Sequence, residues 1–202
     1  MARSAEVRAE AVFREHGGVL RTSEALAAGI NPVTLYRMID DGRLDKLTRG
    51  VYQLADGPGL QYPDLVAVQR RVPRGVVCLI SALAFHELTD QIPHAVHMAL
   101  PSHARKPQIS YPPTSFYWFS DVCFAAGIET HQADGTELRV YGRAKTVADA
   151  FKFRGKIGRD VALEALHFYM DRPDYSMDEL VHYAKLCRVF SVMRPYMEAL
   201  LQ

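Results

Sequence analysis

The residue types best suited to chemistry are cations, and one group of them lies between residues 31 and 49. Thr34 and Arg37 stand three residues apart, a spacing that places both on one face of a helix. A guanidinium such as that of Arg37 can donate two hydrogen bonds to a guanine, while Thr34 or Val33 can pack on a thymine methyl group. The pattern therefore favours base recognition in duplex DNA over catalysis.

Further cations follow in a segment that is expected to form a hairpin. These are Arg43, Lys46 and Arg49. They could contact phosphates or the minor groove, because a flexible cation near a hairpin tip can reach a part of the DNA backbone that the helix cannot. Residues 1–60 nevertheless hold eight basic and eight acidic side chains, so any positive surface must come from uneven placement. The residues predicted to contact DNA are Asn31, Val33, Thr34, Arg37, Arg43, Lys46 and Arg49.

A second cationic stretch spans residues 143–159, with six basic residues against the single acid Asp149. Such clustering is more informative than the net charge of the whole chain. The stretch could bind nucleic acid or an acidic protein surface, or it could be a solvated surface, and the sequence leaves these readings open. Its cations are Arg143, Lys145, Lys152, Arg154, Lys156 and Arg159.

The eight histidines do not predict a metal site. His94, His97 and His103 come closest to a cluster, but their spacing matches no compact zinc signature. Ser81, His86 and Asp90 are residue types of a catalytic triad that would share one helix, which does not bring a serine onto a histidine base. No catalytic residue, metal or cofactor is predicted.

A metal-dependent nuclease is the alternative function. Asp64 and Glu137 are carboxylates of the type that hold divalent ions, but Arg139 stands where such a site would need a lysine. In this alternative the N-terminal domain would target a C-terminal enzyme to DNA. Neither a Walker loop nor a glycine-rich dinucleotide fingerprint occurs in the sequence.

The first cation group needs a scaffold, and the flanking sequence predicts one. A helix is expected over residues 5–15, followed by a short helix that begins at the N-cap Thr22 and stops at Gly29. Asn31 and Pro32 then start a helix that runs to about Asp41, because Asn is a good cap and Pro fits the first turn. Two helices joined by so short a turn describe a helix-turn-helix.

A change of period after Gly42 predicts the wing. Residues 44–48 and 51–54 read as strands around the tip Arg49-Gly50. Residues 1–57 are therefore expected to form a winged helix-turn-helix domain, and Gly57-Pro58-Gly59 a linker.

Residues 62–202 are expected to form a mixed α/β domain, so the fold class is α+β. Val76–Ile80 is apolar and should lead into a helix over 81–88. The other expected strands are 95–100, 115–119, 122–131 and 137–141, and the other expected helices are 146–153, 159–170, 177–187 and 189–201.

Composition limits the class of protein. Of 202 residues, 49% are hydrophobic and 23% charged, which is ordinary for a folded soluble protein, and the net charge is only +1. Three scattered cysteines favour buried free thiols in a reducing compartment. No secretory signal or membrane-spanning run is recognisable, so a cytoplasmic protein without a membrane partner is expected.

The N-terminal pattern resembles the AbiEi family of type IV antitoxins. The resemblance rests on residues 13–54, in which the segments GGVLRTSEAL, NPVTLYR and LTRGVYQL fall where that family has them. It extends more loosely through ISALAFHELT (residues 80–89), residues 97–101 and GRAKTVADAF (residues 142–151).

The resemblance implies a bacterial repressor that binds its own operator DNA through the winged domain. It further implies that the C-terminal domain counters a nucleotidyltransferase toxin encoded beside it, without requiring a stable complex. By the same resemblance, the DNA-contacting helix and wing map onto Asn31, Val33, Thr34, Arg37, Lys46 and Arg49, and an antitoxicity surface onto residues 143–159.

Overall fold

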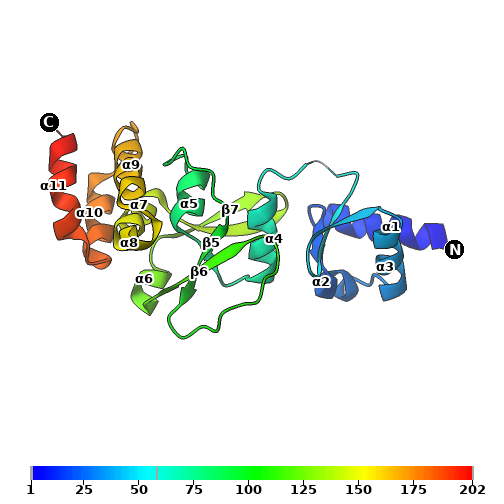
Figure 1. Cartoon of the computed structure of the whole chain (residues 1–202). Helices are drawn as coiled ribbons and strands as arrows, with labels where there is room; N and C mark the ends of the chain where they lie inside the picture. Colours follow the sequence, from blue (N-terminus) through cyan, green and yellow to red (C-terminus); the bar gives the residue numbers. More distant parts are fainter. Residues whose placement is uncertain (1, 58, 202) are drawn as a thin grey trace. The chain divides into compact units, whose positions relative to one another are not determined.

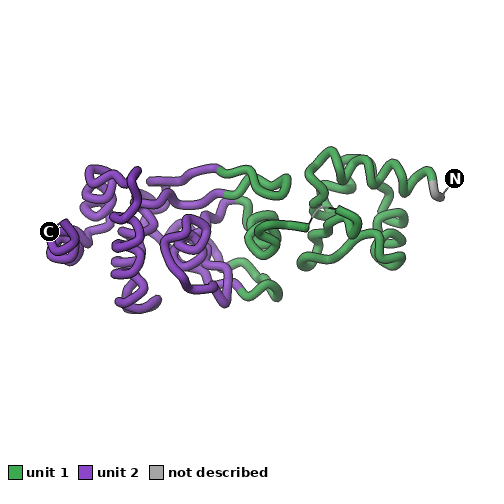
Figure 2. Tube along the Cα trace, turned by 90° about the horizontal axis from the view of Figure 1, so that it is seen from above, with its two compact units in different colours: residues 1–73, 107–113, 131–138 green, residues 74–106, 114–130, 139–202 purple. Residues whose placement is uncertain are grey.

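The protein is described here by a computed structural model that covers residues 2–57 and 59–201. The chain divides into two compact units (Figure 2). Unit 1 contains the chain up to Pro73 together with Pro107–Pro113 and His131–Leu138. Unit 2 contains Arg74–Lys106, Thr114–Thr130 and the chain from Arg139 onward.

The N-terminal part of unit 1 is a winged helix-turn-helix (Figure 1). Its three helices are α1 (Ala2–Glu15), α2 (Thr22–Ala27) and α3 (Pro32–Asp40). Its three strands are β1 (Val19–Arg21), β2 (Leu44–Thr48) and β3 (Val51–Leu54), and they form an antiparallel sheet in the order β1-β3-β2. The helices and the hairpin agree with the sequence expectation, whereas β1 was not expected.

Local signals explain where α2 and α3 begin. Asn31 caps α3, because its side-chain oxygen accepts a hydrogen bond from the backbone N–H of Val33 at 2.9 Å. The prediction that Thr22 caps α2 is wrong. Arg21 occupies the cap position, and its backbone N–H donates to the carboxylate of Glu24 at 2.8 Å. The acidic side chain in the first turn thus satisfies the backbone N–H of the cap residue, which is the Glu half of a capping box.

Unit 1 also contains α4 (Pro63–Arg71), a helix that the sequence did not predict. The carboxylate of Asp134 accepts the backbone N–H groups of Gln61 and Tyr62 just before α4 begins, at 3.0 and 2.9 Å. Arg70, near the end of α4, donates to the hydroxyl of Thr136 and forms an ion pair with Glu24 at 3.2 Å. These contacts tie the segments of unit 1 together.

A five-stranded mixed sheet has the order β6-β5-β4-β8-β7. Strand β5 runs parallel to β6 and antiparallel to β4, which in turn pairs in parallel with β8. The strands are β4 (Val76–Val77), β5 (Val96–Pro101), β6 (Thr114–Phe119), β7 (Ile128–Ala133) and β8 (Thr136–Tyr141).

The prediction of a strand over residues 122–131 is wrong for the first half of this segment. This segment begins with the short helix α6 (Asp121–Ala125), turns at Gly127 with φ +72°, and only then enters β7. Its mixture of apolar and small residues suits either element, and here only Cys123 of α6 is buried.

Helices complete unit 2 and supply most of its core. They are α5 (Leu79–Phe85), α7 (Arg143–Lys152), α8 (Arg154–Ile157), α9 (Arg159–Met170), α10 (Met177–Leu186) and α11 (Phe190–Leu200). The short α8 was not expected. Helix α7 is buried from Ala144 to Phe151 and packs against α5, α9 and α10, so it lies at the centre of this unit.

Candidate nucleic-acid interface

The outer face of α3 is the strongest candidate for DNA recognition. Leu35 and Met38 are fully buried in the domain core, whereas Val33 is 65% and Tyr36 56% exposed. Arg37 is exposed as well, so an apolar, an aromatic and a cationic side chain share the open face at helical spacing. Tyr36 was missed by the sequence analysis, although the inward pattern of its neighbours already leaves it outside.

Arg37 is held in place without being withdrawn from solvent. One guanidinium nitrogen lies 3.6 Å from a carboxylate oxygen of Glu6 on α1, and the side chain remains 45% exposed. A guanidinium has five donors, so one such contact leaves others for a guanine edge. The ion pair restricts the side-chain rotamers before any DNA arrives.

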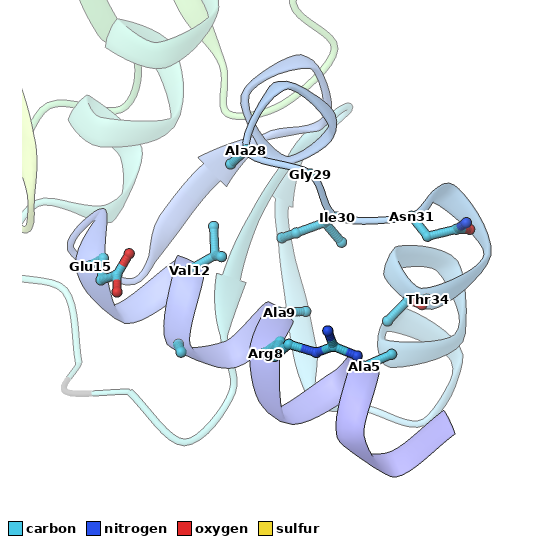
Figure 3. A pocket seen from close by; sticks show the side chains of 11 residues that line it. Ala5, Arg8, Ala9, Val12, Glu15, Ala28, Gly29, Ile30, Asn31 and Thr34 are labelled. Carbon is cyan, nitrogen blue, oxygen red and sulfur yellow. The ribbon is translucent and has the colours of Figure 1, made fainter. Parts of the chain in front are cut away.

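Asn31 and Thr34 line a groove rather than the open face of α3 (Figure 3). The groove has a volume of about 500 Å³ and lies between α1 and the turn that joins α2 to α3. Thr34 is half buried there, and the side-chain oxygen of Asn31 is already used as a cap. Thr34 therefore has less free surface for a base than the predicted spacing implied, whereas Asn31 stays exposed with its side-chain oxygen engaged.

Arg43 was predicted to contact phosphate, but the structure gives it partners inside the protein. Its guanidinium donates to Glu6 at 2.7 Å and also to Glu10, both on α1. Glu6 is only 9% exposed, so this is a partly desolvated ionic network. Arg43 therefore anchors α1 to the start of β2.

Lys46 and Arg49 remain as the free cations of the wing. Both are exposed, and neither has an acidic partner among the residues that the structure describes. Gly50 adopts a φ of +74° at the hairpin tip, and its carbonyl accepts the backbone N–H of Thr22 at 3.0 Å. The tip is thus fixed to the first residue of α2.

The second cationic stretch does not form one patch. Lys145 is fully buried and donates to the carboxylate of Asp149 at 2.5 Å, so it cannot belong to a binding surface. Arg143, at the first turn of α7, forms a two-pronged ion pair with Asp174. That pair raises the pKa of Arg143 and lowers the pKa of Asp174.

The remaining cations lie at the end of α7 and beyond it. Lys152 donates to the sulfur of Cys123 at 3.5 Å, and Arg154 donates to the carbonyl of Phe151 at 2.7 Å. Burial raises the pKa of Cys123, but hydrogen bonds from Ser120 and Lys152 and the lysine charge outweigh it and lower that pKa overall. Lys156 and Arg159 are exposed.

The triad residue types are engaged elsewhere. The hydroxyl of Ser81 donates to the carbonyl of Ala95 and accepts the backbone N–H of His97. The ring of His86 bonds to the carbonyl of Tyr141 at 2.8 Å. These contacts give both residues structural roles.

The predicted nuclease residues do not assemble into a metal site. Asp64 is exposed on α4 and Glu137 is exposed on β8, while Arg139 donates to the carbonyl of Arg74 at 2.8 Å. Within residues 2–57 and 59–201, no three His, Cys, Asp or Glu side chains gather in a way that could hold a metal ion. No helix in the same ranges is long and apolar enough to cross a bilayer. The three cysteines are buried free thiols, as expected.

Comparisons with known proteins agree with this N-terminal fold. Residues 7–55 match the sequence model of a family described as transcriptional regulator, AbiEi antitoxin. No curated protein matches the chain. Among solved structures, the Rv2827c protein from Mycobacterium tuberculosis is similar with a TM-score of 0.54 at 14% identity. The match covers 94% of this chain and 79% of that one, so the likeness in fold extends beyond the winged domain.

Proposed function

Because residues 7–55 match the AbiEi antitoxin family of transcriptional regulators, we propose that this chain is a bacterial DNA-binding autoregulator and antitoxin. It binds operator DNA through the N-terminal winged helix-turn-helix, for which we propose the boundary of residues 1–57. The observation that carries the proposal is the open face of α3, where exposed Arg37 stands beside exposed Val33 and Tyr36 on a helix whose other face is buried in the domain core.

The proposed contacts divide into two kinds. In this motif the N-terminal part of the second helix meets base edges in the major groove. Arg37 then reads a guanine and Val33 packs on a thymine methyl, whereas Lys46 and Arg49 pair with phosphates. Asn31 and Thr34 border the same entry end of α3.

The experiment is a titration of Arg37→Ala and Arg49→Ala against the DNA upstream of this gene and against a scrambled duplex. Arg37→Ala should cost roughly 1–3 kcal/mol on the upstream DNA and relax the preference at one base pair. Arg49→Ala should weaken both duplexes alike and reduce the slope of log K against log salt by about 0.9.

Arg14→Ala is the matched control, because Arg14 is an exposed arginine on α1 that pairs with Glu10 and Asp56. It should leave the affinity for both duplexes unchanged. Equal binding by wild type and by both test variants would rule out this recognition surface.

The antitoxin half of the proposal concerns the C-terminal domain, residues 62–202. We propose that it counters a nucleotidyltransferase toxin in the cytoplasm without needing a stable complex, and that the cations around α8 take part. Substituting Lys152, Arg154 and Lys156 together by Gln should reduce colony survival when the neighbouring toxin gene is co-expressed. Operator binding should be retained, because these residues lie in unit 2, outside the winged domain. Full survival would exclude the three cations from antitoxicity.

A further inference from the structure

The side of α1 that borders the groove of Figure 3 carries two opposite charges among small and apolar side chains. Ala5, Arg8, Ala9, Val12 and Glu15 follow one another at helical spacing, so they lie along one side of the helix. We call these five residues the α1 stripe. Ala9 is buried and Ala5 and Val12 are half buried, whereas Arg8 and Glu15 are exposed.

Neither charge of the α1 stripe has an ionic partner among the residues that the structure describes. The Nε atom of Arg8 donates to the backbone carbonyl of Ser4 at 3.3 Å, which leaves the terminal amino groups of the guanidinium. Arg14 on the same helix, by contrast, pairs with two acidic side chains of the domain. Arg8 and Glu15 are therefore available to a partner outside the chain.

The groove beside the α1 stripe leaves room for a helix to approach. Its other wall is formed by Ala28, Gly29 and Ile30, which join α2 to α3 (Figure 3). A Cβ atom added at Gly29 would meet no atom within 4 Å, so space is open in front of this wall. Two helices pack at a distance set by the side chains between them, and small side chains allow a close approach.

We propose that the α1 stripe pairs with the α1 stripe of a second copy of this chain, with the two helices antiparallel. Arg8 and Glu15 are seven residues apart, which is about two helical turns. In an antiparallel pair centred on Ala11 and Val12, Arg8 of each copy lies opposite Glu15 of the other. The result is a pair of ion pairs related by a twofold axis.

The charges favour this occupant of the groove over others. A parallel pair of α1 helices would place Arg8 against Arg8 and Glu15 against Glu15. Nucleic acid would be repelled by Glu15, and a protein surface of a single charge would complement only one end of the α1 stripe. An antiparallel second copy satisfies both ends at once.

We expect the pairing to be weak in the free protein and stronger on DNA. Two helices of 14 residues bury less surface than a stable protein complex does, and exposed ion pairs contribute little each. DNA that holds two copies side by side raises their effective concentration. This last step rests on the proposed function, in which a twofold pair presents two α3 helices to an inverted repeat.

Sedimentation equilibrium of the full-length protein without DNA, from micromolar to millimolar concentration, tests the pairing. The wild type should dimerise. Arg8→Glu and Glu15→Arg should each raise the dissociation constant about ten-fold or more, because each places like charges opposite one another at both ends of the interface. The double variant Arg8→Glu with Glu15→Arg should recover the wild-type affinity. An equimolar mixture of the two single variants should also dimerise, since each supplies the charge that the other lacks.

Arg14→Glu is the matched control, because Arg14 is an exposed arginine of α1 that does not line the groove. It should dimerise like the wild type, and circular dichroism of each variant checks that it is folded. The proposal is overturned if the wild type stays monomeric at every concentration, if the single reversals dimerise as well as the wild type, or if the folded double variant does not recover. A monomer that still binds the upstream DNA would overturn the pairing and leave the proposed function standing, whereas a dimer that binds no DNA would do the reverse.

Discussion

At the scale of single residues, Arg37 and Arg43 differ in how far each guanidinium is engaged by the acidic side chains of α1. Both were predicted to face DNA, and both pair with Glu6, but Arg43 also holds Glu10 and is committed to the fold. The packing of α1 decides which arginine keeps guanidinium donors available. That packing cannot be predicted from the spacing of the arginines or from the charge of the neighbouring residues.

Lys145 shows the same limit more strongly. In the sequence it belongs to a run of cations, and a run of cations usually indicates a solvated surface. The structure instead buries it completely, with its ammonium 4.2 Å from the centroid of the Tyr141 ring. Only the tertiary contacts of α7 with its neighbours reveal this position.

His97 gives a pH prediction at this scale. Burial lowers its pKa to about 4, below the ordinary value of 6.5, so between these values the unfolded chain binds a proton that the folded chain rejects. The contribution of His97 to the free energy of unfolding is therefore complete above a pH of 6.5, and it is lost as the pH falls from there toward about 4.

The measurement is urea unfolding of wild type and His97→Phe at about pH 7 and about pH 4.5. On acidification, the free energy of unfolding of the wild type should fall by roughly 2 kcal/mol more than that of the variant. Phe preserves a ring against Tyr117 but cannot titrate. The same acid loss in both proteins would mean that His97 does not reject the proton.

At the scale of elements, the ionic network of Arg43 joins α1 to the wing. Arg43→Ala should lower the free energy of unfolding by roughly 1.5–3 kcal/mol, because it removes charged hydrogen bonds from the nearly buried Glu6. Chemical denaturation measures this loss, and Lys46→Ala serves as its control. Lys46 is three residues away and exposed, so its removal should change stability by less than about 0.5 kcal/mol. An Arg43→Ala protein as stable as the wild type would contradict this structural role.

Helix α7 offers a second prediction, since it carries the buried pair of Lys145 and Asp149. Replacing Lys145 alone by Met should cost roughly 3–5 kcal/mol, because the buried carboxylate of Asp149 loses its cation and keeps the weak donor Cys187. Burial raises the pKa of Asp149, which opposes its charged form, and the lysine offsets part of that effect. The double variant Lys145→Met with Asp149→Leu should recover much of the loss. A double variant that is no better than the single one would show that the two residues are not coupled.

The sequence predicts correctly those elements that begin or turn at capping and turn-forming residues. Asn31 and Pro32 start α3, and Gly50 turns the wing, through contacts within a few residues. Helix α4 has Pro63 and Asp64 in its first turn, but residues 65–69 are all buried and show no helical period of polar and apolar side chains, so the start signal alone did not predict the helix. Strand β1 is three residues long and gains its identity only by pairing with β3.

At the scale of the whole molecule, unit 1 is assembled from three separate stretches of the chain. Ion pairs and hydrogen bonds connect these stretches to one another. Burial raises the pKa of Glu24, but the backbone N–H of Arg21 and the charge of Arg70 overcome that effect and leave it below its ordinary value. Asp134 likewise accepts hydrogen bonds from residues that lie far away in sequence.

This interleaving bears on how such a regulator can evolve. A domain that is contiguous in sequence and makes few contacts outside itself can be exchanged between genes by recombination. Residues 1–57 instead contact later segments of the chain, and an exchange would remove those contacts. A graft made at the linker would separate Glu24 from Arg70 and Thr48 from the carbonyl of Tyr111. If the proposed operator contacts hold, new DNA specificity is more readily acquired by point substitution on the open face of α3 than by exchanging residues 1–57 as a block.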